Sequence, residues 1–75
     1  MELDLFIANF ADQFDDTDAS EINAGTEFKE LDEWSSMIVL SVIAMAKTDY
    51  GKSITGAEIR SCTTVEDLYN LILSK

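Results

Sequence analysis

The chain of 75 residues has no histidine, no proline, a single cysteine and only three glycines. Without histidine, a Ser-His-Asp triad and a Cys-His pair are both excluded, and a zinc site would lack its usual soft ligands. The lone Cys62 cannot form a disulfide within the chain. The absence of proline and the scarcity of glycine favour helices over a turn-rich β-fold.

Basic residues are also few, because five Lys and Arg stand against fifteen Asp and Glu, for a formal net charge of −10. Residues 1–33 hold eleven of the acids and one base, whereas residues 34–75 hold four of each. Phosphate backbones and anionic membranes attract Lys and Arg, so we expect no nucleic-acid binding and no docking on such membranes. The longest apolar stretch, residues 37–46, is well short of the ~20 residues of a membrane span, which predicts no membrane insertion.

Length and composition predict one small domain. The apolar fraction of 47% separates the chain from disordered proteins. The acidic N-terminus does not look like a signal peptide, and a single cysteine suits a reducing compartment. We therefore expect a cytoplasmic monomer.

Apolar spacing predicts helices over residues 2–14 and 36–50. Ser35 is expected to cap the second of these, and Gly51 to end it in a left-handed conformation. Residues 15–34 have no clean period and predict a long loop, for which Phe28 and Leu31 are the expected anchors.

Two Ser/Thr-x-x-Glu patterns follow. Thr55 and Glu58 predict a capping box that opens a short helix to about residue 61, and Thr63 with Glu66 predicts the start of the last helix. The expected fold is all-α: a four-helix bundle with a long first loop and a short third helix.

At about 100° per residue, the second predicted helix has two faces. The side expected to be core comprises Val39, Val42, Ile43, Ala46 and Tyr50. The opposite side has no charged residue and comprises Met37, Ser41, Ala44, Met45 and Thr48.

The pair Ser35-Ser36 lies where the long loop meets this helix. A helix N-terminus offers free N–H groups that can hold a phosphate, so an exposed serine there could carry a phosphodiester. No base adjoins it, and another enzyme would have to attach the group. The alternative is that one serine caps the helix and the other is solvated.

The whole chain resembles the acyl carrier protein family. The family's Asp-Ser-Leu signature opens the second helix of a four-helix bundle and reads Ser35-Ser36-Met37 here. The spacing from Ser36 to Tyr50-Gly51 is similar to the family's. Further similar positions are Phe28, Leu31, Ile54 and the Thr63-Thr64-Val65 run. The resemblance implies that residues 1–75 form a single acyl-carrier-like domain.

The resemblance further implies that Ser36 carries a covalent 4'-phosphopantetheine arm, with Ser35 as the less favoured attachment residue. The thiol of the arm would hold acyl intermediates as thioesters. The protein would then be a stand-alone carrier and not an enzyme, for fatty-acid, polyketide or related specialised acyl biosynthesis. The alternatives are a peptidyl carrier of a nonribosomal pathway and a small acidic interaction module without a prosthetic group.

The implied partners are a phosphopantetheinyl transferase and acyl-activating, acyltransferase or synthase enzymes. The residues expected to meet them are Trp34, Met37, Ser41, Ala44 and Met45. Because residues 37–46 carry no charge, we expect partner binding to depend weakly on salt. The residues implied to line an acyl pocket are Phe28, Val39, Ile43, Ala46, Ile54, Ile59 and Cys62.

A competing pattern lies in the loop, where Asp16, Asp18, Ser20 and Glu27 match positions 1, 3, 5 and 12 of a calcium-binding EF-hand. The glycine that this loop needs at position 6 is Glu21. We therefore expect a solvated acidic loop and no specific metal site.

Overall fold

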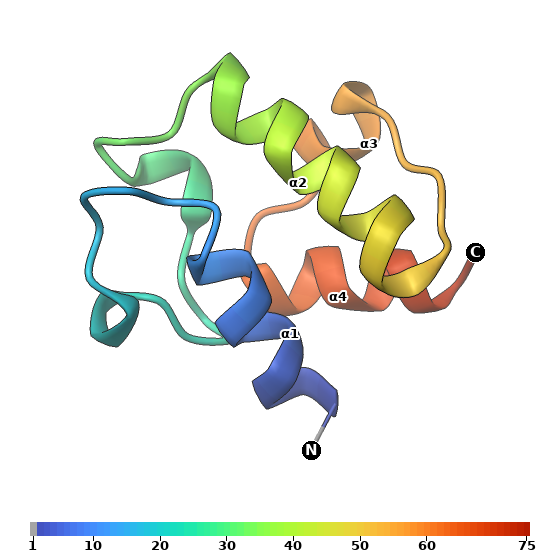
Figure 1. Cartoon of the computed structure of the whole chain (residues 1–75), viewed down its shortest axis with the longest axis horizontal. Coiled ribbons are helices and arrows are strands. Elements are labelled where there is room, and N and C mark those ends of the chain that lie inside the picture. The colour runs from blue at the N-terminus through green and yellow to red at the C-terminus, as the bar shows by residue number, and fades with distance from the viewer. Residues whose placement is uncertain (1) are drawn as a thin grey trace.

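The computed structural model describes residues 2–75, and those residues contain helices and no strand (Figure 1). The α-helices are α1 (Glu2–Ala11), α2 (Ser36–Tyr50), α3 (Gly56–Arg60) and α4 (Val65–Leu73). Two single-turn 3-10 helices, η1 (Ala19–Glu21) and η2 (Phe28–Glu30), lie in the connection between α1 and α2. The expected all-helical class, the long first connection and the short third helix are confirmed.

The ends of α2 lie where the sequence places them. Ser35 is the N-cap in an extended conformation, and its hydroxyl accepts a hydrogen bond from the Ile38 N–H at 3.4 Å. Gly51 follows the helix with φ 65° and ψ 23°, the left-handed conformation in which glycine avoids a Cβ clash.

The capping box of α3 is confirmed, because the Thr55 hydroxyl accepts from the Glu58 N–H while the Glu58 carboxylate accepts from the Thr55 N–H. The expected start of α4 is wrong by one residue. Thr64, not Thr63, is the N-cap, and Asp67 completes the box. Asp67 takes the role expected of Glu66, because the shorter carboxylate of Asp also reaches back to the cap. It accepts a hydrogen bond from the Thr64 N–H at 3.0 Å.

Helix α1 ends at Ala11, three residues before the expected end. The chain still turns Phe14 inward, where its side chain is buried. The apolar spacing that suggested a longer helix therefore reflects burial of Phe14 and not helical backbone.

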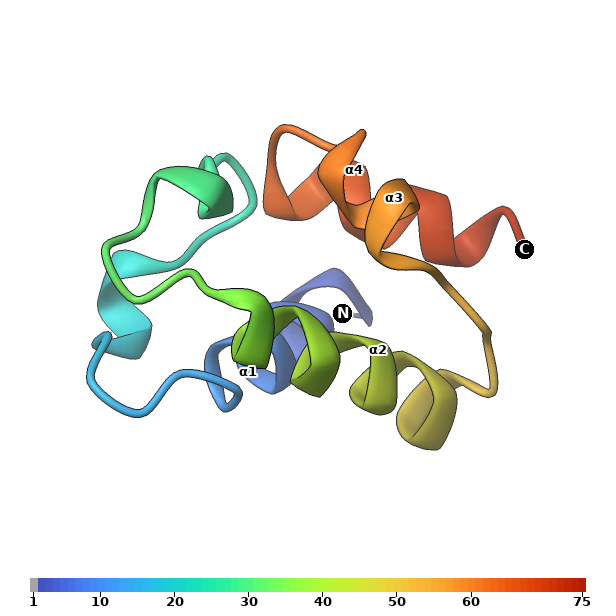
Figure 2. The same ribbon diagram turned by 90° about the horizontal axis from the view of Figure 1, so that it is seen from above.

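One apolar core joins the four helices and the long connection. Helix α1 packs against α2 and α4, and α3 packs against α2 (Figure 2). The largest wholly buried side chains of the core are the aromatic rings of Phe6, Phe10 and Phe28. The other buried core residues are Ala11, Phe14, Ile22, Ile38, Val42, Met45, Ala46, Ile54, Ile59, Cys62, Val65, Leu68 and Ile72.

The long connection is tied to α4 through its backbone. The N–H groups of Val65 and Glu66, free donors at the start of α4, donate to the carbonyls of Thr26 and Ala24 at 3.1 and 3.0 Å. Of the two expected anchors, Phe28 is wholly buried and Leu31 is half-buried. These contacts hold residues 24–31 of the connection against the bundle.

Candidate functional site

The two serines at the start of α2 differ in their bonding. The Ser35 hydroxyl is engaged as the helix cap. Ser36 is the first helical residue and is exposed, and its hydroxyl bonds to no other group in residues 2–75. The N–H groups of Ser36 and Met37 lie in the first turn, where no intrahelical carbonyl is available to them. Ser36 is thus the serine whose oxygen is free for modification.

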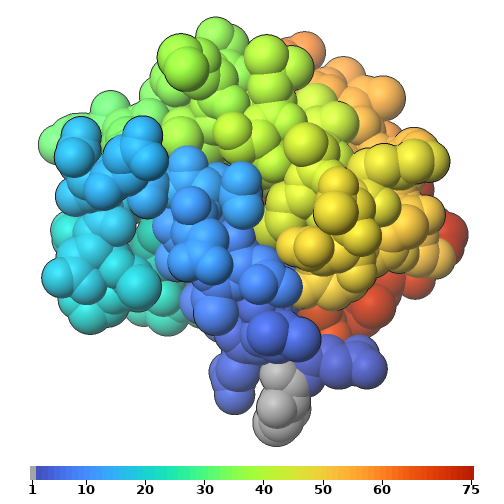
Figure 3. Space-filling view, in the orientation of Figure 1, coloured from blue at the N-terminus to red at the C-terminus, as the bar shows by residue number. Residues whose placement is uncertain are grey.

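An apolar stripe runs along the exposed side of α2 next to Ser36. Met37 and Leu40 are 76% and 66% exposed, and Ala44 is exposed one turn further on. We call Met37, Leu40 and Ala44 the α2 stripe. In Figure 3 atoms of α2, in green to yellow, lie on the molecular surface beside the first loop. Leu40 was absent from the expected docking set, although its spacing from Met37 and Ala44 on the helix indicates the same face.

The expectation that Met45 lies on the outer face is wrong, because Met45 is only 5% exposed. Met45 is seven residues after Ile38, so the two side chains lie about 20° apart around the helix, and both are buried. The buried arc is wide because α2 packs against α1 on one side and α3 on the other. Ser41 is half-buried between the two faces.

Trp34 fixes the approach to α2. Its indole lies 4.8 Å from the Phe28 ring in an edge-to-face arrangement and stacks on Phe10 and Phe14 at 6.5 and 6.3 Å. Such pairs stabilise beyond the area they bury. The side chain is half-buried, so Trp34 anchors the segment that leads to Ser35.

The residues expected to line an acyl pocket come together in the core. Phe28, Ala46, Ile54, Ile59 and Cys62 are buried in one cluster, while Val39 and Ile43 are partly buried and pack against it. Burial raises the pKa of the Cys62 thiol, and its sulfur lies 3.5 Å from the Glu58 carbonyl. Cys62 is therefore a packed core side chain whose thiol form is favoured.

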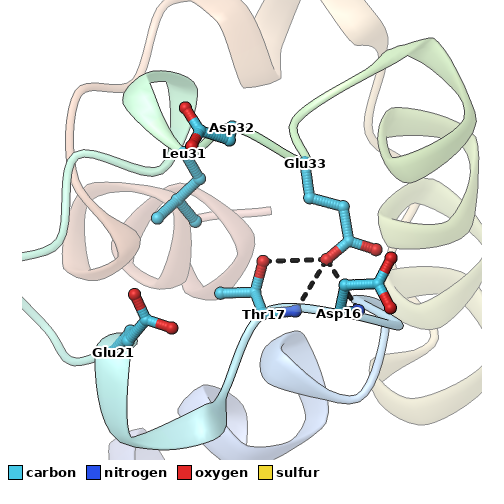
Figure 4. A pocket seen from close by; sticks show the side chains of 6 residues that line it. All are labelled: Asp16, Thr17, Glu21, Leu31, Asp32 and Glu33. Carbon is cyan, nitrogen blue, oxygen red and sulfur yellow. Dashed lines mark hydrogen bonds between the residues drawn. The ribbon is translucent and has the colours of Figure 1, made fainter.

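A hollow of about 350 Å³ opens beside the start of α2 (Figure 4). Sequence reasoning did not predict it, because its wall is made from two separate parts of the first connection. The lining residues are Asp16, Thr17, Glu21, Leu31, Asp32 and Glu33.

Glu33 closes one side of this hollow and links the end of the first connection to residues 15–17 near its start. Its carboxylate accepts hydrogen bonds from the backbone N–H groups of Asp15, Asp16 and Thr17 at 2.7, 3.0 and 2.9 Å, and from the Thr17 hydroxyl at 2.8 Å. Desolvation favours the neutral acid, but these bonds favour the carboxylate more strongly, and the net effect lowers the pKa of Glu33.

The three acids and one serine of the EF-hand-like pattern form no metal-binding group in the part of the chain that the structure describes. Asp18 caps η1 by accepting from the Ser20 N–H at 2.9 Å, and hydrogen bonding from Ser20 lowers the pKa of Asp18. Across residues 2–75, no group of three Asp, Glu or Cys side chains is placed to hold a metal ion.

Comparisons with protein-family models, with curated proteins and with solved structures gave no match to this chain. Within residues 2–75, none of the helices is both long enough and apolar enough to cross a membrane.

Proposed function

We propose that this chain is an acyl carrier protein whose Ser36 receives a 4'-phosphopantetheine arm. The observation that carries the proposal is the difference between the two serines: Ser35 is engaged as the cap of α2, while Ser36 is exposed with an unpaired hydroxyl. The four helices with a long first connection suit the bundle of that family. The arm would supply a thiol that holds an acyl group as a thioester.

The start of α2 fits the phosphodiester of such an arm. The positive end of the helix dipole and the free N–H groups of Ser36 and Met37 favour a negative group there. The nearest cation in sequence is Lys29, and its amino group donates to the Arg60 carbonyl at 2.7 Å. Lys29 is thus engaged away from Ser36, and in this proposal a separate transferase attaches the arm.

Coenzyme A is the donor of the arm in this transfer reaction. The Ser36 oxygen attacks the phosphorus that bears the pantetheine, and its proton passes to a base of the transferase. The bond from this phosphorus to the bridging oxygen of coenzyme A breaks, which releases 3',5'-adenosine bisphosphate.

The cargo would be an acyl chain of a fatty-acid, polyketide or related specialised pathway. It would enter the bundle by displacing side chains such as Val39 and Ile43, which are only partly buried.

The test is to incubate the protein with coenzyme A and a broad-specificity phosphopantetheinyl transferase and to measure its intact mass. We expect a gain of one phosphopantetheine group in the wild type and in Ser35→Ala, and no gain in Ser36→Ala. A gain that survives Ser36→Ala, or no gain in the wild type, contradicts the assignment. Ser35→Ala is a matched control one residue away, which removes the helix cap but leaves the attachment oxygen.

The exposed α2 stripe also favours a second candidate, a small acidic interaction module without a prosthetic group. Met37 and Leu40 would then bind a partner directly. The intact mass separates the two, because the module has no route to an added group.

A further inference from the structure

We propose that Glu33 is a positioning residue for the attachment of the arm, because its carboxylate closes the neck of the first connection and so holds the approach to Ser36. We define the neck as residues 14–17, which come shortly after α1, together with residues 33 and 34, which precede the cap of α2. This role rests on the proposed function, since it concerns the same serine. Glu33 acts through the segment that leads to Ser36 and not by contact with the arm.

The Glu33 carboxylate uses both of its oxygens within the neck. Oε2 accepts from the Asp15 N–H at 2.7 Å. Oε1 accepts from the N–H groups of Asp16 and Thr17 at 3.0 and 2.9 Å, and from the Thr17 hydroxyl at 2.8 Å (Figure 4). Successive N–H groups that converge form a concave site for an anion, and an ionised carboxylate accepts at about four positions. Glu33 and its site therefore match in charge and in number of bonds.

Trp34 closes the same neck through an aromatic contact. Its indole stacks on the Phe14 ring at 6.3 Å, so two consecutive residues before α2 contact four consecutive residues after α1. Phe14 is buried in the core, whereas the bonds to Glu33 lie at exposed or partly buried positions. Hydrogen bonds that solvent reaches open at lower cost than core contacts. The carboxylate bonds are therefore the part of the neck that opens first.

Ser36 follows the neck directly. Ser35 caps α2, and Ser36 is its first helical residue. The Trp34 N–H donates to the Leu31 carbonyl at 3.0 Å, which makes residues 31–34 a turn. Because the Ser36 side chain is exposed, its orientation depends on this backbone path. A transferase has to align the Ser36 oxygen with the phosphorus of coenzyme A, so freedom in the path lowers the fraction of molecules that are ready to react.

The alternative is that Glu33 only stabilises the fold. A residue with that role alone changes the fraction of folded molecules, which stays close to one after a modest loss of stability. Neither KM nor kcat then changes. An open neck, in contrast, lowers the fraction of competent carrier and raises the KM of the transferase for the carrier. The kcat stays the same, because the bound complex has the ordered segment again. The two roles therefore differ in a measurable constant.

The test measures KM and kcat of a broad-specificity phosphopantetheinyl transferase for the full chain, with coenzyme A at neutral pH. Glu33→Gln places an amide donor against the N–H groups of the neck, and we expect KM to rise about tenfold, as for the loss of one charge-assisted hydrogen bond. Thr17→Val removes only the hydroxyl bond and should raise KM about threefold, whereas Thr17→Ser keeps that bond and should match the wild type. The charge-matched control is Glu30→Gln, at an exposed position in the same connection, and its KM should stay within about twofold of the wild type.

The Thr17 pair separates positioning from charge. Thr17→Val changes no charge, so a higher KM in this variant cannot arise from recognition of acidic side chains by the transferase. The pair also keeps the test open if Glu33→Gln does not fold, which circular dichroism checks for every variant.

Amide hydrogen exchange tests the neck independently of the arm. In Glu33→Gln, or in Thr17→Val, the amides of residues 15–17 should lose protection by a larger factor than those of α4. An equal loss in α4 shows general destabilisation and overturns the positioning role. An unchanged KM in Glu33→Gln and Thr17→Val, or an equal rise in Glu30→Gln and Glu33→Gln, also overturns it but leaves the proposed function intact. A wild type that the transferase does not load overturns both.

Discussion

Phe28 should be the residue that holds the first loop in place, and Phe28→Ala tests this. The ring is wholly buried, lies edge-to-face to Trp34 at 4.8 Å and contacts Phe10 at 5.7 Å. Its loss would leave a cavity beneath η2 and would free Trp34 from its closest partner. The approach to Ser36 depends on the same contacts.

The magnitude follows from the chemistry of the site. A buried Phe→Ala change costs about 3–5 kcal/mol, while a domain of this length has a total stability of roughly 4–11 kcal/mol. The variant should therefore lose about a quarter or more of its free energy of unfolding, and its Tm should fall by about 12 °C or more.

Urea unfolding measures this loss, with Trp34 fluorescence and far-ultraviolet circular dichroism as two probes. Trp34 is the only tryptophan and reports directly on the packing around Phe28. If Phe28→Ala does not fold, Phe28→Leu should still lose about 1–3 kcal/mol, since two aromatic pairs disappear. Leu5→Ala, at 59% exposure, is the control and should change stability by no more than about 0.5 kcal/mol. A cost below about 1 kcal/mol for Phe28→Ala would refute the anchoring role.

Two further predictions concern charge. Hydrogen bonds lower the pKa of Glu33 below its ordinary value of 4.5, so the contribution of Glu33 to stability is present above that pH and is lost as the pH falls through the lowered pKa. The difference in unfolding free energy between wild type and Glu33→Gln should therefore be constant near neutrality and shrink below about pH 4.5. A difference that is independent of pH contradicts this prediction. Added salt should raise the Tm of the wild type, because it screens the repulsion among the acids that crowd residues 1–33. Salt would weaken only one ion pair in residues 2–75, Glu58–Lys75. An unchanged or lower midpoint in thermal melts counts against repulsion as the dominant electrostatic effect.

Local signals in the sequence predicted the helices well. The cap at Ser35, the left-handed Gly51 and the Thr55–Glu58 box each depend on residues within one helical turn, so the sequence contains all of their chemistry. The start of α4 was wrong by one residue because Thr63 and Thr64 both have an acid three positions later, and only tertiary contacts with the loop select between them.

Features that depend on the packing of distant segments could not be predicted in this way. Met45 is buried because α2 has neighbours on two sides, and a helical wheel contains no information on their directions. The role of Glu33 requires that residues 15–17 fold back to it, across a connection without a repeating pattern. The exposure of Leu40, in contrast, could have been read from its position on the helix.

The central claim is that Ser36 carries the arm, and the most direct measurement is the mass of the protein recovered from its native host. Intact-mass analysis with fragmentation of the peptide that contains residues 34–37 reports both the group and its position. We expect phosphopantetheine on Ser36, with or without an acyl cargo on its thiol. A protein whose Ser36 is unmodified in its host, or whose added group is located on Ser35, would contradict it.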